Sequence, residues 1–243
     1  MDTDAQAGSG ERRRDSSAPW AILSALPEEL GSLRDRCTAR RRVQGLELLE
    51  LDLGGRPALA CVSGVGKVAA ARATAILLAE GAIGGLLIVG TCGGLKRALV
   101  PGTLVHCTTA FQADLAVREG RAVESDAAWR SAWRSVAPGP EGWFLTADRP
   151  VLSPWRRIRL ARAFAGDCVA DMETAAAASV AARAEVPWAA LRAVTDVASL
   201  FSARGFRRNY PTQAGRAADT LFALARRVAE RDAVRDPGNT PPG

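Results

Sequence analysis

The sequence has few of the residues from which metal centres and common catalytic triads are built. Its 243 residues contain one histidine, His106, and five cysteines with no Cys-x-x-Cys pair or Cys/His cluster. A three-histidine metal site is therefore impossible, and no zinc site is expected. A Ser-His-Asp triad would depend entirely on His106, which follows an apolar, strand-like run and is interpreted as structural.

Long apolar runs and concentrated positive charge are also missing. No apolar run reaches the roughly 18 residues of a membrane span. The net charge is +6, but lysine occurs only at positions 67 and 96, and the arginines are spread along the chain. Because no basic stripe interleaved with aromatic residues is visible, nucleic acid is not expected as a partner.

The two ends of the chain differ in composition from the rest. Residues 1–18 are polar and lack the apolar core of a signal peptide. We therefore expect a disordered leader over residues 1–18, a single domain over residues 19–230 and a disordered tail over residues 231–243. The expected location is cytoplasmic.

Apolar runs and alanine-rich segments follow one another along the chain. The apolar runs predict strands over residues 19–26, 46–53, 57–62, 86–89, 142–147, 168–171 and 187–194. Helices are predicted over residues 67–80, 154–165, 174–184 and 212–230, with a further helix start at residues 27–30. Residues 113–140 give no clear prediction. This alternation predicts an α/β fold with a mostly parallel sheet covered on both faces.

Polar or glycine-rich segments follow several of the predicted strands. They are Glu29, residues 64–66, residues 90–94, residues 171–173 and Asp196. In open α/β sheets, ligands bind beyond the carboxyl ends of the strands. These five segments could therefore converge on one pocket.

Each segment also has a purely structural interpretation. Residues 64–70 match a dinucleotide-binding pattern weakly, and the same glycines could serve only a tight turn against a helix. Asp171 and Glu173 precede an alanine-rich helix, where acids often interact with the helix dipole. Asp196 either caps a helix or is an acid held in a pocket.

Five stretches in order resemble the nucleoside phosphorylase superfamily and, within it, the 5′-methylthioadenosine/S-adenosylhomocysteine nucleosidases. The stretches are residues 25–30 (ALPEEL), 63–70 (SGVGKVAA), 90–95 (GTCGGL), 171–174 (DMET) and 192–198 (RAVTDVA). The resemblance implies a three-layer α/β sandwich with a distorted mixed, mostly parallel central sheet flanked by helices. It also implies a homodimer, a purine nucleoside substrate and no organic cofactor.

The resemblance further implies the roles of individual residues. Asp196 aligns with the acid that protonates N7 of the purine, and Glu29 with the acid that contacts the nucleophilic water. Glu173 aligns with the ligand of the ribose 2′ and 3′ hydroxyls, while Asp171 is interpreted as structural. Further substrate-binding residues are expected to be Met172 under the sugar, Thr91 beside the ribose, Val151 against the base, and Gly93, Val65 and Phe206.

The expected reaction is hydrolysis of the N-glycosidic bond of a purine nucleoside, with a 5′-modified adenosine as substrate and release of the free base. Departures from the family pattern leave the 5′ substituent open: Pro27 replaces a common acid, and the Thr91–Cys92 pair is more similar to uridine phosphorylases. Phosphorolysis is the first alternative, although the start of the chain lacks a Gly-Asp-Pro-x-Arg phosphate loop. A nucleoside-binding protein without turnover is the second.

Overall fold

Three parallel strands form the centre of the sheet in the computed structural model, which describes residues 18–117, 119–197 and 202–235. β1 (Trp20–Ser24) lies between β4 (Pro57–Val62) and β5 (Gly85–Gly94), and both pairings are parallel. Every residue of β1 is buried, as expected for a strand covered on both faces. Beyond β4, two antiparallel strands extend the sheet, β3 (Leu46–Asp52) and β2 (Cys37–Val43).

On the other side of the centre, the sheet closes into a barrel. The end of β5 leaves β1 and pairs with β9 (Asp167–Asp171), while β10 (Trp188–Val197) runs along the other edge of β5. β10 then pairs with β6 (Leu104–Gln112), and β6 leads through β8 (Glu141–Thr146) back to β9. Strands β5, β10, β6, β8 and β9 thus form a closed ring, and β7 (Ala122–Glu124) is added to β6.

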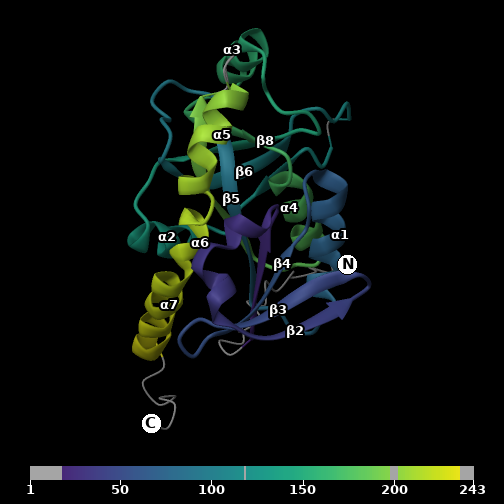
Figure 1. Cartoon of the computed structure of the whole chain (residues 1–243), viewed down its shortest axis with the longest axis vertical. Coiled ribbons are helices and arrows are strands. Elements are labelled where there is room, and N and C mark those ends of the chain that lie inside the picture. Colours follow the sequence, from purple (N-terminus) through teal and green to yellow (C-terminus); the bar gives the residue numbers. More distant parts are fainter. Residues whose placement is uncertain (1–17, 118, 198–201, 236–243) are drawn as a thin grey trace, which may run out of the picture.

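Helices cover both faces of the central strands (Figure 1). One face carries α1 (Lys67–Leu78) and α4 (Thr174–Arg183); the other carries α2 (Ala127–Val136), α6 (Arg216–Asp219) and α7 (Leu221–Arg235). Side chains along β1 point alternately to the two faces of the sheet. Ala21 and Leu23 pack in the core beneath α1 and α4, and Trp20 and Ile22 pack in the core beneath α2, α6 and α7. The remaining helices are η1 (Pro27–Arg36), α3 (Pro154–Ala163) and α5 (Ser202–Gln213).

The α/β fold is as predicted, but the expectation of a mostly parallel three-layer sandwich needs correction. Among the described residues, five strand pairings are parallel (β1–β4, β1–β5, β5–β10, β6–β8 and β8–β9) and five are antiparallel (β2–β3, β3–β4, β5–β9, β6–β7 and β6–β10). The barrel is an additional departure. An apolar run reports that a strand is buried on both faces, but it carries no information on the direction of the neighbouring strand.

Several elements also differ from the sequence-based expectation. Residues 113–140, which gave no clear prediction, contain β7 and α2, and the single helix expected over residues 212–230 is divided between the end of α5, α6 and α7. α7 continues to Arg235, past the expected end of the domain at residue 230. Most of the expected leader, residues 1–17, lies outside the described residues. Within the described residues, no helix has both the length and the apolar character needed to cross a bilayer.

Candidate active site

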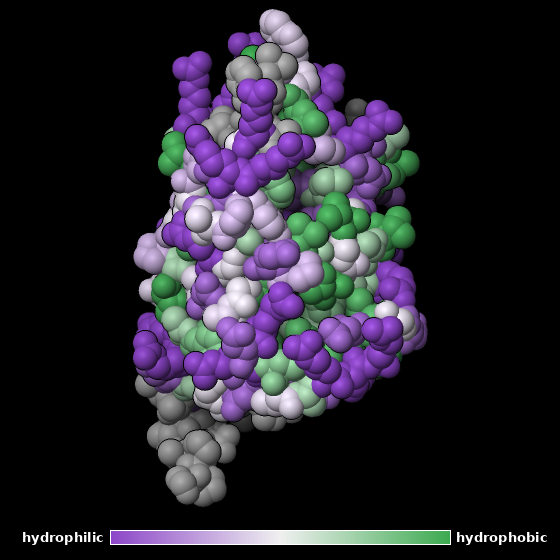
Figure 2. Space-filling view, viewed as in Figure 1, coloured by the Kyte–Doolittle hydropathy of each residue, from purple (hydrophilic) through white to green (hydrophobic). Residues whose placement is uncertain are grey.

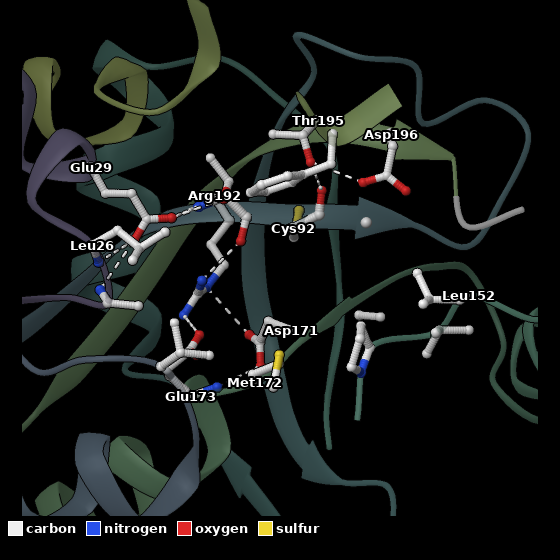
Figure 3. Close-up of a pocket in the computed structure, with 18 of the residues that line it drawn as sticks. Leu26, Glu29, Cys92, Leu152, Asp171, Met172, Glu173, Arg192, Thr195 and Asp196 are labelled. Atoms are coloured by element: carbon white, nitrogen blue, oxygen red, sulfur yellow. Dashed lines mark hydrogen bonds and ion pairs between the residues drawn. The ribbon is translucent and has the colours of Figure 1, made fainter. Parts of the chain in front are cut away.

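One cavity of about 450 Å³ opens beyond the carboxyl ends of β1, β5 and β10. The loops after β4, β8 and β9 and one side of α5 complete its walls (Figure 3). All nine sequence-predicted site residues lie in its lining: Glu29, Val65, Thr91, Gly93, Val151, Met172, Glu173, Asp196 and Phe206. The structure therefore brings together residues from seven separate parts of the chain, and their predicted roles can be compared with their surroundings.

Glu29 lies at one side of the cavity with both carboxylate oxygens occupied. Its Oε2 accepts hydrogen bonds from the backbone N–H groups of Ala25 and Leu26, at 3.1 and 3.2 Å. Its Oε1 accepts from the backbone N–H and the hydroxyl of Thr91, at 2.9 and 2.8 Å. Because four donors converge on a residue that is only 2% exposed, both carboxylate oxygens of Glu29 act as hydrogen-bond acceptors.

Gly90 makes room for this carboxylate. A Cβ atom at position 90 would lie 2.9 Å from the Glu29 carboxylate atoms, and the backbone there has φ of +149°. Both the close approach and the positive φ require glycine. Within the glycine-rich segment 90–94, position 90 therefore has to be glycine for Glu29 to occupy its place in the site.

Glu173 stands at the start of α4 and joins two other segments. Its Oε1 accepts from the backbone N–H of Gly66 at 3.0 Å, and its Oε2 accepts from Arg192 at 3.1 Å. Burial raises the pKa of the Glu173 carboxyl, and the Arg192 charge partly offsets this effect. The turn of residues 64–66 thus contacts the predicted ribose ligand, rather than serving helix packing alone.

Arg192 connects the acids of the cavity, and sequence reasoning did not place it among the site residues. Its guanidinium is fully buried on β10 and donates to the Thr91 carbonyl (2.8 Å) and the Thr174 hydroxyl (3.0 Å), besides Glu173. It also forms an ion pair with Asp171 at 3.3 Å. Burial alone would lower the pKa of Arg192, but the two carboxylates outweigh it and raise the pKa. An arginine inside an otherwise apolar strand was the available signal.

Asp171 has the structural surroundings expected of it. Its Oδ1 accepts from the Thr146 hydroxyl at 2.6 Å and, at 3.3 Å, from the backbone N–H groups of Glu173 and Thr174 at the start of α4. Its Oδ2 accepts no hydrogen bond and faces only the Arg192 charge, so the structural role rests on Oδ1, which caps the helix, and on the ion pair.

Asp196 lies on the opposite side of the cavity from Glu29 (Figure 3). β10 shifts its register against β5 between Val194 and Asp196, which turns this side chain to the cavity. The Thr195 hydroxyl donates to Asp196 Oδ1 at 3.0 Å. α5 packs against this bulge, because Asn209 donates to the Thr195 carbonyl at 2.7 Å.

A family model described as Phosphorylase superfamily matches residues 19–230. The chain belongs to this superfamily. A 5′-methylthioadenosine/S-adenosylhomocysteine nucleosidase of Geobacillus sp. (strain WCH70) is 27% identical over 223 residues, covering 84% of this chain and 96% of that protein. The family predicted from the five sequence stretches is therefore confirmed.

Solved structures of the superfamily match the fold over most of the chain. The nucleosidase of the same name from Neisseria meningitidis, in complex with methylthio-immucillin-A, has a TM-score of 0.79 and 25% identity, covering 85% of this chain and 97% of that one. Futalosine hydrolase of Helicobacter pylori also has a TM-score of 0.79, at 20% identity and coverage of 88% and 98%. This second likeness concerns the fold alone.

Several lining residues of this superfamily member lie outside the predicted set. They are Ala25, Leu26, Cys92, Pro150, Leu152, Ala170, Asp171, Arg192, Thr195 and Arg207. His106, by contrast, is buried in the core, and its Nε2 lies 2.7 Å from the Ala137 carbonyl oxygen. Among the described residues, no group of three histidine, cysteine or acidic side chains could hold a metal ion.

Proposed function

We propose that this chain hydrolyses the N-glycosidic bond of a 5′-modified adenosine and releases adenine. The observation that carries the proposal is the separation of three carboxylates in one cavity, with Glu29 and Asp196 on opposite sides and Glu173 between them and below (Figure 3). A nucleoside needs an acid at its base, an acceptor at its hydroxyls and a held water at the sugar. The nucleosidase names of the relatives support the same substrate class.

The proposed reaction breaks the C1′–N9 bond as adenine takes a proton at N7. Asp196 supplies or shares that proton, since an adenine anion is a poor leaving group. The sugar becomes oxocarbenium-like, and the buried carboxylates stabilise its positive charge. A water oxygen then bonds to C1′, the released water proton passes to the Glu29 carboxylate and on to solvent, and Asp196 regains a proton from solvent. The products are adenine and the free 5′-modified ribose.

The contacts of Glu29 restrict how it handles the water. All four of its acceptor positions are in use, and three of the donors are fixed backbone N–H groups. The Thr91 hydroxyl is the one donor that can rotate. If this hydroxyl turns toward the ribose, Glu29 Oε1 regains a position for the water. Thr91 would then couple sugar binding to water binding.

The remaining predicted residues give the cavity an apolar lining around the nucleoside. Met172 follows Asp171 on the loop that carries Glu173, where it can support the sugar from below. Val151 and Phe206 come from the loop after β8 and from α5. Position 205 of α5 directly approaches Asp196, so we place the base on this side of the cavity. Val65 and Gly93 complete the proposed substrate-binding set.

The test is a panel of adenosine derivatives that differ at the 5′ position, incubated with the chain in phosphate-free buffer. Chromatography of the products should show adenine and the free sugar from at least one derivative. Binding measured by calorimetry with no adenine from any derivative would instead support a nucleoside-binding protein without turnover. Adenosine itself serves as the control for the contribution of the 5′ substituent.

Phosphorolysis is a second candidate, favoured by one observation. Arg207 on α5 lines the cavity and could pair with a phosphate, whereas Arg192 is already engaged by protein acceptors. Adding phosphate to the same assay separates the two reactions, because phosphorolysis yields a sugar 1-phosphate and accelerates with phosphate concentration. Turnover that is indifferent to phosphate would leave hydrolysis as the function.

We also propose a homodimer and a cytoplasmic location, as the family resemblance and the sequence imply. Val68 on α1 is 84% exposed, and Val65 is exposed beside it at the cavity. Figure 2 shows hydrophobic side chains gathered on the side of the molecule where Figure 1 places α1 and α4. Burial of such a patch between two copies would stabilise a dimer. Light scattering after gel filtration tests the mass, and cell fractionation tests the location.

A further inference from the structure

Helix α3 forms one end of the molecule and buries none of its residues fully (Figure 1). Its inner side, with Leu160, Ala161 and Phe164 just beyond its end, packs on a small cluster of core residues. Its outer side carries Trp155 and Ile158, and Leu152 is exposed immediately before the helix. Trp155 is 82% exposed, which is unusual for a side chain of this size in a folded domain.

The charge around these apolar side chains is mainly positive, although Asp148 and Asp167 flank the segment. Residues 149–166 contain five arginines and no acidic residue. α5, at the same end of the molecule in Figure 1, adds Arg204, Arg207 and Arg208, again without an acid. Figure 2 shows long hydrophilic side chains projecting from this end. The net charge of the whole chain is +6, so this end is more basic than the average of the surface.

We propose that the α3 end of the molecule docks on an anionic lipid bilayer. A short surface helix with tryptophan and aliphatic residues beside arginines matches the bilayer interface, where the indole lies at headgroup level and the arginines meet lipid phosphates. Charge complementarity disfavours a second copy of the chain on this face, because two such faces would repel each other. The aliphatic side chains of Leu152 and Ile158 favour an acyl boundary over a nucleic acid.

Docking in this way would place the cavity mouth at the membrane. Leu152 belongs both to the exposed apolar surface and to the cavity lining, and Arg207 of α5 also lines the cavity. Nucleosides would then enter and leave beside the lipid surface. The association is peripheral, and it is independent of whether the cavity hydrolyses its ligand.

Cosedimentation of the full chain with vesicles tests the proposal. The chain should bind vesicles of phosphatidylcholine with phosphatidylglycerol, bind poorly to phosphatidylcholine alone, and release as salt screens the charges. Trp155 is the one exposed tryptophan of the six, so its fluorescence should shift to the blue and become protected from quenching on binding.

Variants locate the contact. Arg159→Gln with Arg162→Gln should weaken binding roughly 25-fold, since each arginine near an anionic surface contributes about 1 kcal/mol, or about fivefold. Trp155→Ala should weaken it about tenfold through lost apolar burial and abolish the blue shift. Arg226→Gln with Arg227→Gln is the matched control, because α7 lies at the opposite end and these arginines are exposed as well.

The thermal unfolding temperatures of all variants should match that of the unchanged chain, because the altered side chains are exposed. Equal vesicle binding by the α3 variants and the α7 control would overturn the proposal. Failure of the unchanged chain to bind anionic vesicles at low salt would overturn it as well. The proposal would also be overturned if the α3 variants kept vesicle binding but lost the ability to bind an oligonucleotide or to form a dimer. Such a result would assign this surface to another partner.

Discussion

Asp196 is placed by a local irregularity, and the proposed proton transfer depends on this one side chain. The register shift between Val194 and Asp196 turns the carboxyl into the cavity, and the Thr195 hydroxyl holds one of its oxygens. An amide at this position would keep the shape and lose the acid. Substitution of Asp196 by asparagine can therefore separate an effect on substrate binding from an effect on the chemical step.

We predict that Asp196→Asn lowers kcat for adenine release by about 10²–10⁴-fold, the usual contribution of a general acid. Binding of adenosine analogues, measured by calorimetry, should change far less. Asp35→Asn on η1, exposed and outside the cavity, is the control and should keep full activity. Equal losses of affinity and turnover in Asp196→Asn would show that this residue only binds.

At Gly90, the backbone conformation and the nearby Glu29 carboxylate leave no room for a larger residue. We predict that Gly90→Ala lowers stability by about 1–3 kcal/mol through backbone strain, and lowers kcat further by displacing Glu29. Gly120→Ala is the matched control, because Gly120 also has a positive φ but a Cβ there would meet nothing within 4 Å. Urea unfolding and steady-state kinetics measure the two effects. A Gly90 variant no worse in kcat than the Gly120 control would contradict the steric argument.

At the scale of elements, the Arg192 side chain on β10 contacts both β5 and α4. Its guanidinium reaches the Thr91 carbonyl on β5, the Thr174 hydroxyl on α4 and the two carboxylates that precede α4. A positive charge held between these elements keeps Glu173 pointed at the cavity. Removing the charge would leave Asp171 and Glu173 buried beside each other without compensation.

We predict that Arg192→Met lowers the free energy of unfolding by about 3–5 kcal/mol, as for other buried ion pairs that lose one partner. Arg226→Met, whose side chain is 80% exposed, should change it by less than about 0.5 kcal/mol. Adding Asp171→Asn and Glu173→Gln to Arg192→Met should recover part of the loss, because the unpaired charges disappear. Urea titration gives all three values, and no recovery in the triple variant would argue against an electrostatic cause.

The elements that sequence reasoning missed have explanations at the same scale. Asp126 caps the start of α2 by accepting from the Trp129 N–H at 2.9 Å, and the helix buries Trp129 and Trp133 one turn apart. The capping residue and this spacing were visible in the sequence, but the surrounding arginines obscured them. α5 contains Pro211, and a proline argues against a helix when the sequence is considered alone.

For the whole molecule, the single histidine connects stability to pH. Burial lowers the pKa of His106 below its ordinary value of 6.5, although its bond to the Ala137 carbonyl opposes this effect. The unfolded chain therefore binds the proton more readily than the folded one. It follows that His106 contributes stability that is present above about pH 6.5 and is lost as the pH falls below it.

We predict that the free energy of unfolding falls as the pH drops below 6.5, by at most about 1.4 kcal/mol per pH unit from this residue. His106→Gln should be less stable at pH 8 but should show a flatter dependence between pH 7 and pH 5.5. The difference between the two chains isolates His106, because the sequence contains no other histidine. Parallel slopes for both chains would refute the assignment.

The sequence by itself determined the family, the order of most strands and helices, and which segments carry the site. These follow from contiguous patterns: short apolar runs, alanine-rich stretches and five motifs that each span a few residues. The nine residues predicted from them lie in one cavity, and their roles in binding and catalysis stay predictions. Local sequence patterns are sufficient to predict the family, the elements and the site segments, because each pattern depends only on residues that are neighbours in the chain.

Only the tertiary structure decided how those segments act on one another. Barrel closure depends on β10 and β9 meeting β5, and two of the four donors to Glu29 come from Thr91, 62 positions away. Glu173 is held by Gly66 and by Arg192, 107 positions before it and 19 after it. The two bonds from Thr91 to Glu29 and the ion pairs that neutralise Arg192 form only when separate segments pack together, so no local pattern encodes them.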